Sequence, residues 1–200
     1  MSGITLQERK AASTKAPQQA RSDTPERLLR AAAKEFNEKG FGGTDTNRIA
    51  RRAGFAPQTF YRWFHDKVDI FIKTYENWQR DELGTLSRLI RENASHLRLA
   101  RAVVAYHEKY LVFRRSLRQL AIENQAVRAA RAQSRVNQIA FIRARNPKFA
   151  RDDAALAAML LQTERLADAL AEGEFGDMGL NKRAGEEALA CLIDDLLTPK

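Results

Sequence analysis

Apolar positions recur three and four residues apart along most of the chain, which is the spacing of one face of an α-helix. No stretch shows the alternating pattern of a half-buried strand, so the pattern predicts an all-α fold. Helices are predicted over residues 24–39, 46–53, 57–64, 66–78, 97–111, 117–124, 127–145, 151–172 and 181–197. The glycine-rich stretch 173–179 is predicted to be a loop.

The stretch 44–67 carries the clearest pattern of all. A short apolar stripe ends at Gly54, where a helix can terminate in the left-handed conformation that glycine adopts at low cost. Pro57 stands at the first position of a new helix, where its missing N–H is not needed. Phe60 and Phe64 are four residues apart and are predicted to point inward. Helix, tight turn and helix form a helix-turn-helix, whose second helix fits the major groove of DNA.

The remaining side chains of the second helix suit contact with a duplex. Gln58, Thr59 and Arg62 are predicted to contact base edges, because amide, hydroxyl and guanidinium groups match donors and acceptors there. Hydroxyl and ammonium groups around this helix can bind phosphate oxygens. The residues predicted to bind phosphates are Thr44, Thr46, Tyr61 and Lys67.

Three segments of residues 27–67, RLLRAAAKEFNEKGFGGT, IARRAG and TFYRWFHDK, resemble the DNA-binding domain of the tetracycline-repressor (TetR) family. The resemblance implies an N-terminal three-helix DNA-binding head with a helix-turn-helix, followed by a helical ligand-binding and dimerisation domain. Ala56 departs from the pattern, since the family usually has a Ser or Thr cap there, and the missing cap costs about 1 kcal/mol. Gln58 stands where Gly or Ala is frequent, which favours sequence-specific binding.

The expected domains are a disordered basic arm (1–20), the helix-turn-helix domain (21–67) and a helical effector-binding and dimerisation domain (68–200). The arm is rich in Ser, Thr, Ala, Gln and Lys and lacks aromatic residues. It is either a mobile terminus or an arm that lies along DNA through basic side chains such as Arg9 and Lys10.

The net charge of +9 is unevenly distributed. Residues 1–67 hold 13 basic and 7 acidic residues, which suits a polyanion such as DNA. Residues 80–151 hold 16 basic and 5 acidic residues, whereas residues 152–200 hold 4 and 11. The basic side chains Arg114, Arg115, Arg118, Arg128, Arg131 and Arg135 therefore either lie on a solvated face, pair with the acidic C-terminal region, or bind an anionic effector.

Several classes of site and location are not expected. The longest apolar run is too short to span a membrane, and the N-terminus lacks the apolar stretch of a secretory signal. Cys191 is the only cysteine, which suits a reducing, cytoplasmic location. One Cys and three scattered His do not form a metal site, and no motif pairs a nucleophile with a base. We therefore expect no cofactor, no metal and no catalytic residue, and an enzyme of the same helical build is disfavoured.

The resemblance implies a small-molecule effector, whose identity the sequence leaves open. Polar groups on otherwise apolar helices are the candidates, with core packing as the alternative for each, and these are Trp78, Tyr106, His107, Tyr110, Gln162, Glu164 and Arg165. The alanine-rich last two helices suit a homodimer interface, because small residues permit close backbone approach. A ligand-responsive repressor that binds a palindromic operator is the leading hypothesis. A nonspecific nucleic-acid-binding protein and an activator of the same family are the alternatives.

Overall fold

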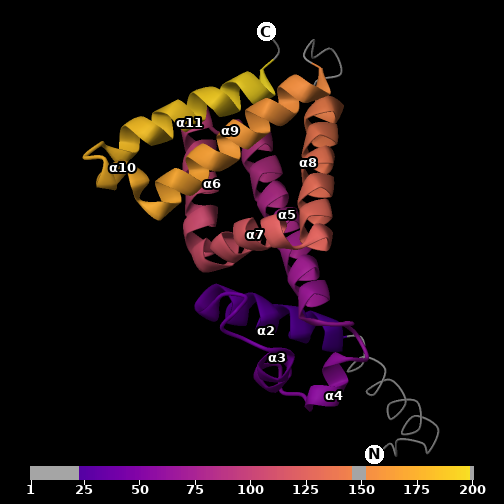
Figure 1. Ribbon diagram of the computed structural model, residues 1–200. Helices are drawn as coiled ribbons and strands as arrows, with labels where there is room; N and C mark the ends of the chain where they lie inside the picture. Colours follow the sequence, from indigo (N-terminus) through magenta and orange to yellow (C-terminus); the bar gives the residue numbers. More distant parts are fainter. Residues whose placement is uncertain (1–22, 146–151, 199–200) are drawn as a thin grey trace, which may run out of the picture. The chain divides into compact units, whose positions relative to one another are not determined.

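The computed structural model describes residues 23–145 and 152–198, and the regular elements within these ranges are α-helices (Figure 1). The all-α class predicted from the sequence is confirmed. Packing divides the chain into two compact units, with the boundary between Thr74 and Tyr75. The predicted basic arm, residues 1–20, lies outside the described residues.

The first unit, called the head below, comprises α2 (Thr24–Lys39), α3 (Thr46–Arg52), α4 (Pro57–Phe60) and the first turns of α5 (Lys67–Arg91). Gly54 adopts φ = 79° between α3 and α4, a conformation that a side chain would strain. The Asp45 carboxylate caps α3 by accepting a 2.8 Å hydrogen bond from the backbone N–H of Arg48. As predicted, α4 starts without a side-chain cap, because Ala56 precedes it.

The head is built around aromatic side chains. Phe36, Phe60 and Phe71 are fully buried, and Phe64 is 6% exposed, so the inward direction predicted for Phe60 and Phe64 is confirmed. Phe41 packs between two of these rings, with its centroid 5.9 Å from Phe36 and 5.3 Å from Phe71. Phe71 belongs to α5, so the first turns of α5 complete the core of the head, which extends as a compact unit to Thr74.

The start of α2 lacks a side-chain cap. Asp23 occupies the position before the helix, but its side chain makes no capping hydrogen bond. Its carboxylate instead pairs with Arg30, at 3.2 Å. Pro25 stands in the first turn of α2, where its missing N–H is not needed.

The second unit, called the body below, contains the remainder of α5 and the helices that follow it. These are α6 (His96–Lys109), α7 (Leu111–Glu123), α8 (Gln125–Arg145), α9 (Asp153–Glu172), α10 (Glu174–Asp177) and α11 (Lys182–Leu197). The predicted loop 173–179 therefore contains one helical turn, and α7 begins six residues before the predicted start at Leu117. None of the helices in the described ranges has the length and apolar character needed to cross a membrane.

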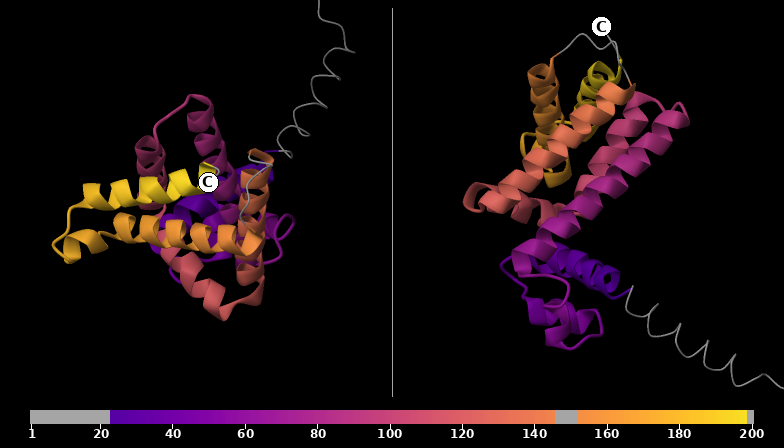
Figure 2. Two further views of the ribbon diagram at one scale, coloured as in Figure 1. Left: turned by 90° about the horizontal axis from the view of Figure 1, so that it is seen from above. Right: turned by 90° about the vertical axis from the view of Figure 1, so that its right-hand side faces the viewer.

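Helices α6, α9 and α11 form the main core of the body. Both views in Figure 2 show α9 and α11 side by side. Their close contact depends on small residues: a Cβ added at Gly185 of α11 would lie 2.4 Å from Cδ2 of Leu170 on α9. Ala167 is fully buried in the same core. Other small residues face outward, and these are Ala154 and Ala158 on α9 and Ala184, Ala188 and Cys191 on α11. The small residues thus serve packing within the chain and also leave an exposed stripe.

Candidate functional site

The outward side of α4 presents polar and aromatic side chains above the buried aromatic core. Gln58 and Arg62 are exposed, and Tyr61 is 60% exposed, whereas Phe60 beneath them is fully buried. Thr59 is half-buried. The residues predicted to contact base edges therefore lie on the free side of the helix-turn-helix, where a duplex can reach them.

The hydroxyl groups of Thr46 and Tyr61 lie 3.0 Å apart and form a hydrogen bond. Thr46 is the first residue of α3, and Tyr61 directly follows α4, so the contact joins the two helices of the motif. The Tyr61 ring also packs edge-on against Phe60, with centroids 5.3 Å apart. Two of the residues predicted to bind phosphates are thereby brought together at the protein surface.

Trp63 is a large aromatic side chain that the sequence reasoning missed. It is 45% exposed and lies between the exposed Arg62 and the buried Phe64. The signal was available, because Phe60 and Phe64 point inward and leave the three intervening residues, 61–63, outside. Exposed aromatic and basic side chains on one surface suit contact with a nucleic-acid backbone.

Thr44 and Lys67 occupy a different position from the other predicted DNA contacts. Thr44 is 5% exposed, and its hydroxyl donates a 2.8 Å hydrogen bond to the Glu35 carboxylate. The Lys67 ammonium donates to the backbone carbonyls of Phe41 and Thr44 at 2.9 and 3.1 Å, and lies 4.1 Å from the Phe41 ring centroid. Partial burial lowers the pKa of Lys67. Both polar groups stabilise the 41–44 loop in the free head, so their contact with phosphate stays a prediction.

Glu35 is the buried carboxylate around which the basic side chains of α3 are arranged. It is 7% exposed and lies 3.1 Å from Arg52 and 3.8 Å from Arg48. Arg52 also pairs with Glu38, at 2.8 Å. These ion pairs fix α3 to α2, and with it the first helix of the motif.

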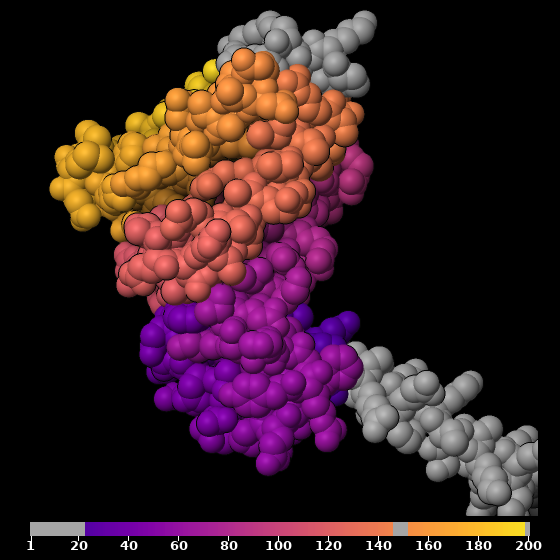
Figure 3. Space-filling model, turned by 45° about the vertical axis from the view of Figure 1, so that its right-hand side comes forward, coloured from indigo at the N-terminus to yellow at the C-terminus, as the bar shows by residue number. Residues whose placement is uncertain are grey.

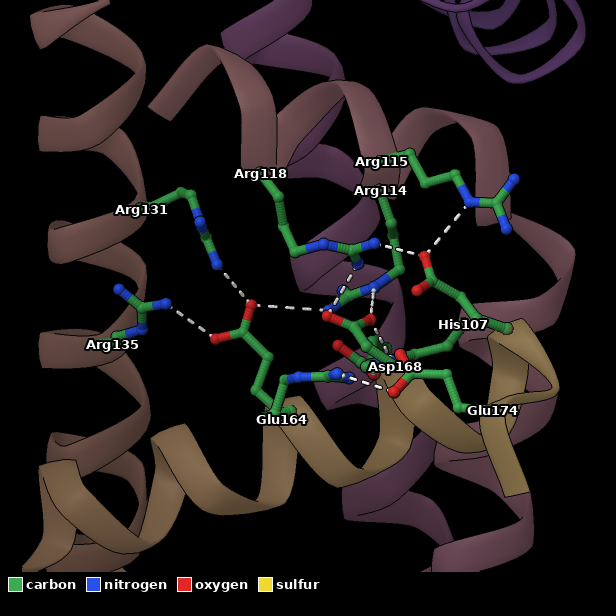
Figure 4. Close-up of polar contacts among 12 residues, drawn as sticks. His107, Arg114, Arg115, Arg118, Arg131, Arg135, Glu164, Asp168 and Glu174 are labelled. Atoms are coloured by element: carbon green, nitrogen blue, oxygen red, sulfur yellow. Dashed lines mark hydrogen bonds and ion pairs between the residues drawn. The ribbon is translucent and has the colours of Figure 1, made fainter. Parts of the chain in front are cut away.

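The body contains a network of ion pairs between its basic middle and its acidic C-terminal region (Figure 4). Asp168 of α9, 3% exposed, lies 2.6 Å from Nε of Arg114 and 2.9 Å from Nη1 of Arg118. Glu172, one turn further along α9, pairs with Arg115 and Arg118. The uneven charge seen in the sequence is thus balanced across the contact between α7 and α9.

Glu164 forms the second centre of the network. Its two carboxylate oxygens accept from Arg131 at 2.6 Å and Arg135 at 2.8 Å, both on α8, and Arg114 lies 3.4 Å away. Figure 4 shows the α8 and α7 side chains converging on α9. Arg128 instead donates to the carbonyls of Ala121 and Ile122 at the end of α7. Pairing with the acidic region, one of the three interpretations of the basic block, is therefore confirmed for the other five arginines.

His107 of α6 lies between two carboxylates in this network. Its Nδ1 is 2.9 Å from Asp168 and its Nε2 is 3.6 Å from Glu82. Burial lowers the pKa of His107, but the contacts with Asp168 and Glu82 outweigh burial and raise it above its usual value. Burial likewise opposes ionisation of Asp168, yet His107 and Arg114 hold the pKa of that carboxyl well below its usual range.

Beside the network the body has a pocket of about 140 Å³. Its polar lining includes two of the candidate effector residues, His107 and Glu164. Arg114 and Arg135 also line the pocket and belong to the basic block that was considered for an anionic effector. The polar lining side chains that the sequence reasoning missed are Tyr75, Gln79, Glu82, Gln138 and Thr163. The apolar lining comes from α5, α6, α8, α9 and α11: Leu83, Leu86, Ile90, Leu99, Val103, Phe141, Ile142, Leu160, Ile193, Leu196 and Leu197.

The other predicted effector residues lie elsewhere. Gln162 and Arg165 are exposed, and Arg165 pairs with Glu174 at 2.7 Å. The side of α9 that faces the pocket carries Leu160 and Glu164 instead. Trp78, Tyr106 and Tyr110 form an aromatic cluster outside the lining, with centroids 5.5 to 6.1 Å apart. Trp78 is 4% exposed and is thus part of the core, the alternative considered for it.

No group of His, Cys, Asp and Glu suited to a metal ion occurs in ranges 23–145 and 152–198. The chemistry that the described surfaces offer is hydrogen bonding and charge at the head, and a mixed polar and apolar pocket in the body.

Residues 28–74 match the family model of bacterial regulatory proteins, tetR family. This match assigns the head to the DNA-binding domain of the TetR family. The matched residues contain the helix-turn-helix described above. A curated TetR-like relative, the uncharacterised HTH-type transcriptional regulator YdgC of Bacillus subtilis (strain 168), is 32% identical over 71 residues. That match covers 36% of this chain and 36% of YdgC, so it spans about a third of the relative's length.

Solved structures show that the TetR-family fold extends through the body. A TetR-family regulator from Rhodococcus sp. shares 18% identity and covers 88% of this chain and 100% of its own, with a TM-score of 0.66. The regulator FadR from Bacillus subtilis, solved with stearoyl-CoA, also shares 18% identity and covers 88% of this chain and 98% of its own, with a TM-score of 0.53. At these identities the similarity establishes the fold of the chain.

Proposed function

We propose that this TetR-family regulator is a dimeric repressor that binds a two-fold symmetric operator and is released by a small molecule bound in the body. The observation that carries the proposal is the exposed surface of Gln58, Tyr61 and Arg62, held above the buried Phe60. Such a surface can enter the major groove without rearrangement of the head. A regulator of this kind acts in the cytoplasm, where bacterial DNA lies.

The proposed contacts divide into two groups. Gln58, Thr59 and Arg62 contact base edges and supply sequence preference, since amide and guanidinium groups can form paired hydrogen bonds there. The joined hydroxyls of Thr46 and Tyr61 contact phosphates and set the angle of α4 in the groove. Trp63 adds a further contact at the same surface. Thr44 and Lys67 support this surface from within through the 41–44 loop.

The proposed dimer interface is formed by α9 and α11. The two helices lie side by side, and both expose small residues at helical spacing, such as Ala154 and Ala158 on α9. Leu161, 47% exposed, extends the stripe on α9. Two copies related by a two-fold axis would form a four-helix bundle from these surfaces. Two heads then contact half-sites about 34–36 Å apart, one turn of the duplex.

The proposed effector site is the pocket of the body. Its mixed lining suits a small molecule with an apolar part and a hydrogen-bonding group. FadR from Bacillus subtilis, which shares the fold, holds stearoyl-CoA. By analogy the effector favours a conformation in which the two heads no longer match the operator spacing, which requires only different affinities for the two forms.

Competition with bulk genomic DNA tests the proposal. A specific operator complex of the full chain should persist at a mass excess of competitor, because specific binding exceeds nonspecific binding by about 10³-fold or more. Sedimentation of the same sample should show two chains per operator. Loss of the complex in proportion to competitor would favour the nonspecific alternative, and a 1:1 complex would contradict the dimer.

A further inference from the structure

The pocket of the body has a polar end and an apolar end. The lining residues of α5 change from polar to apolar along the helix. Gln79 and Glu82 line the pocket first, and Leu83, Leu86 and Ile90 line it one to three turns later. The apolar end is completed by residues of α6 and α11, including Leu99, Val103, Ile193 and Leu196. A molecule in this pocket therefore meets hydrocarbon along most of its length and polar groups at one end.

The size of the pocket limits the apolar part of its ligand. Its volume is about 140 Å³. An apolar protein cavity of about 150 Å³ binds benzene. A single ring or a chain of similar volume fills this space.

The charged groups at the polar end are already paired with one another. Glu164 accepts from Arg131 and Arg135, and Arg114 donates to Asp168. Glu82 lies beside His107. A charged ligand would have to separate one of these pairs, and a buried charge without its partner is strongly unfavourable. The polar end therefore disfavours a ligand with a formal charge, although five arginines lie close by.

Two uncharged side chains offer a different kind of contact. The Gln138 amide donates to the Gln79 carbonyl oxygen at 2.9 Å, and Gln79 also accepts from Ser134 at 2.7 Å. Both glutamines line the pocket. Because an amide group offers two donor hydrogens and an acceptor oxygen, these side chains can bind a hydroxyl or carbonyl group.

We infer that the pocket binds an uncharged amphiphile: an apolar part the size of one aromatic ring, with a single hydroxyl or carbonyl group placed against Gln79 and Gln138. The inference rests on the proposed function only in treating this pocket as the effector site. It replaces the anionic effector that the basic composition of the middle region suggested.

Calorimetric titration of the full chain at pH 7 with three probes of nearly equal size tests the inference. Benzyl alcohol is neutral, benzoate carries a negative charge and benzylamine a positive charge. Benzyl alcohol should bind at least tenfold more tightly than either charged probe. Equal or tighter binding of benzoate or benzylamine would overturn the inference.

Variants locate the bound probe. Leu160→Phe adds a ring inside the pocket and should abolish binding of benzyl alcohol, whereas Val136→Phe, at a position that is 56% exposed on α8, should leave it unchanged. Gln138→Leu should weaken benzyl alcohol about tenfold but leave toluene, which has no hydroxyl, unaffected. Gln133→Leu, at an exposed position of the same helix, is the matched control. If Gln138→Leu changes the affinities for benzyl alcohol and toluene equally, Gln138 does not bind the hydroxyl group and its assigned role is overturned.

Operator binding of every variant is measured in parallel, which separates this inference from the proposed function. Benzyl alcohol that binds the wild-type chain and Leu160→Phe equally well overturns the inference, whether or not the chain binds an operator. If Leu160→Phe abolishes binding of benzyl alcohol, the inference is supported, even when the chain binds no operator. A failure of the wild-type chain to bind an operator would overturn the proposed function and leave the inference standing.

Discussion

The hydroxyl of Tyr61 lies 3.0 Å from the hydroxyl of Thr46, so a hydrogen bond at the surface joins the two helices of the DNA-binding motif. A phosphate oxygen can accept from one of these hydroxyls while the other holds it in place. The pair therefore couples the orientation of α4 to contact with the DNA backbone.

Tyr61→Phe should weaken operator binding by about 0.5–1.5 kcal/mol, the contribution of one neutral hydrogen bond, and Thr46→Val should do the same. The double variant should lose less than the sum, because both single variants remove the shared contact. Fluorescence anisotropy at constant salt measures the affinities. Strictly additive losses would show that the two hydroxyls act independently. Thermal unfolding should be nearly unchanged, because the contact is exposed.

Lys67→Met should destabilise the head by about 1–3 kcal/mol, because the carbonyls of Phe41 and Thr44 lose their donor. Hydrogen exchange of the α2 and α3 amides reports this loss for the head alone. Lys34→Met, at an exposed position of α2, is the control and should leave exchange unchanged. Unaltered exchange in Lys67→Met, combined with a smaller salt dependence of DNA binding, would assign Lys67 to phosphate contact instead.

Asp168→Asn should destabilise the body by about 3–5 kcal/mol, because Arg114, only 2% exposed, loses the nearer of its two carboxylate partners and keeps only Glu164 at 3.4 Å. Denaturant unfolding measures the change. Asp177→Asn, at an exposed position of α10, is the matched control and should have little effect. An Asp168→Asn protein as stable as the wild type would show that the ion-pair network is not a stabilising element.

The raised pKa of His107 predicts a stability that depends on pH. A histidine whose pKa is higher in the folded chain contributes stability below its unfolded pKa of about 6.5 and loses it as pH rises through the folded value. The free energy of unfolding should therefore fall between pH 6 and the folded pKa, and His107→Gln should reduce this fall. His65→Gln, whose side chain is 92% exposed, is the control. An identical pH profile in His107→Gln and the wild type would contradict the assignment.

The head was largely predictable because its signals are local. Gly54 and Pro57 fix the turn, and Phe60 and Phe64 mark the buried side of the segment that begins with α4, all within eleven residues of sequence. The same spacing left residues 61–63 outside, although Trp63 was overlooked. The internal role of Lys67 could not be read from the pattern, because its acceptors lie more than twenty residues earlier in the chain.

The body was predictable as helices but not as a site. Apolar residues surround most of α9, so its periodicity does not show whether Gln162 or Glu164 points inward. Long-range packing of α9 on α6, α8 and α11, together with the ion pairs to α7, decides that question and selects the partners of each arginine. In the space-filling view α8 and α9 lie against each other on the face shown (Figure 3). The charge pattern of the sequence predicted pairing between the basic and acidic regions but not which helices would meet.

Selection of bound DNA from a random pool by the full chain tests the central claim most directly. The account predicts an enriched site with two-fold symmetry, whose half-sites are centred about one helical turn apart. Gln58→Ala should keep the symmetry and lose preference at one position in each half-site, at a cost of about 1–3 kcal/mol. A pool without an enriched site would contradict this account. So would a single asymmetric site whose sequence preference is the same for Gln58→Ala and the wild type.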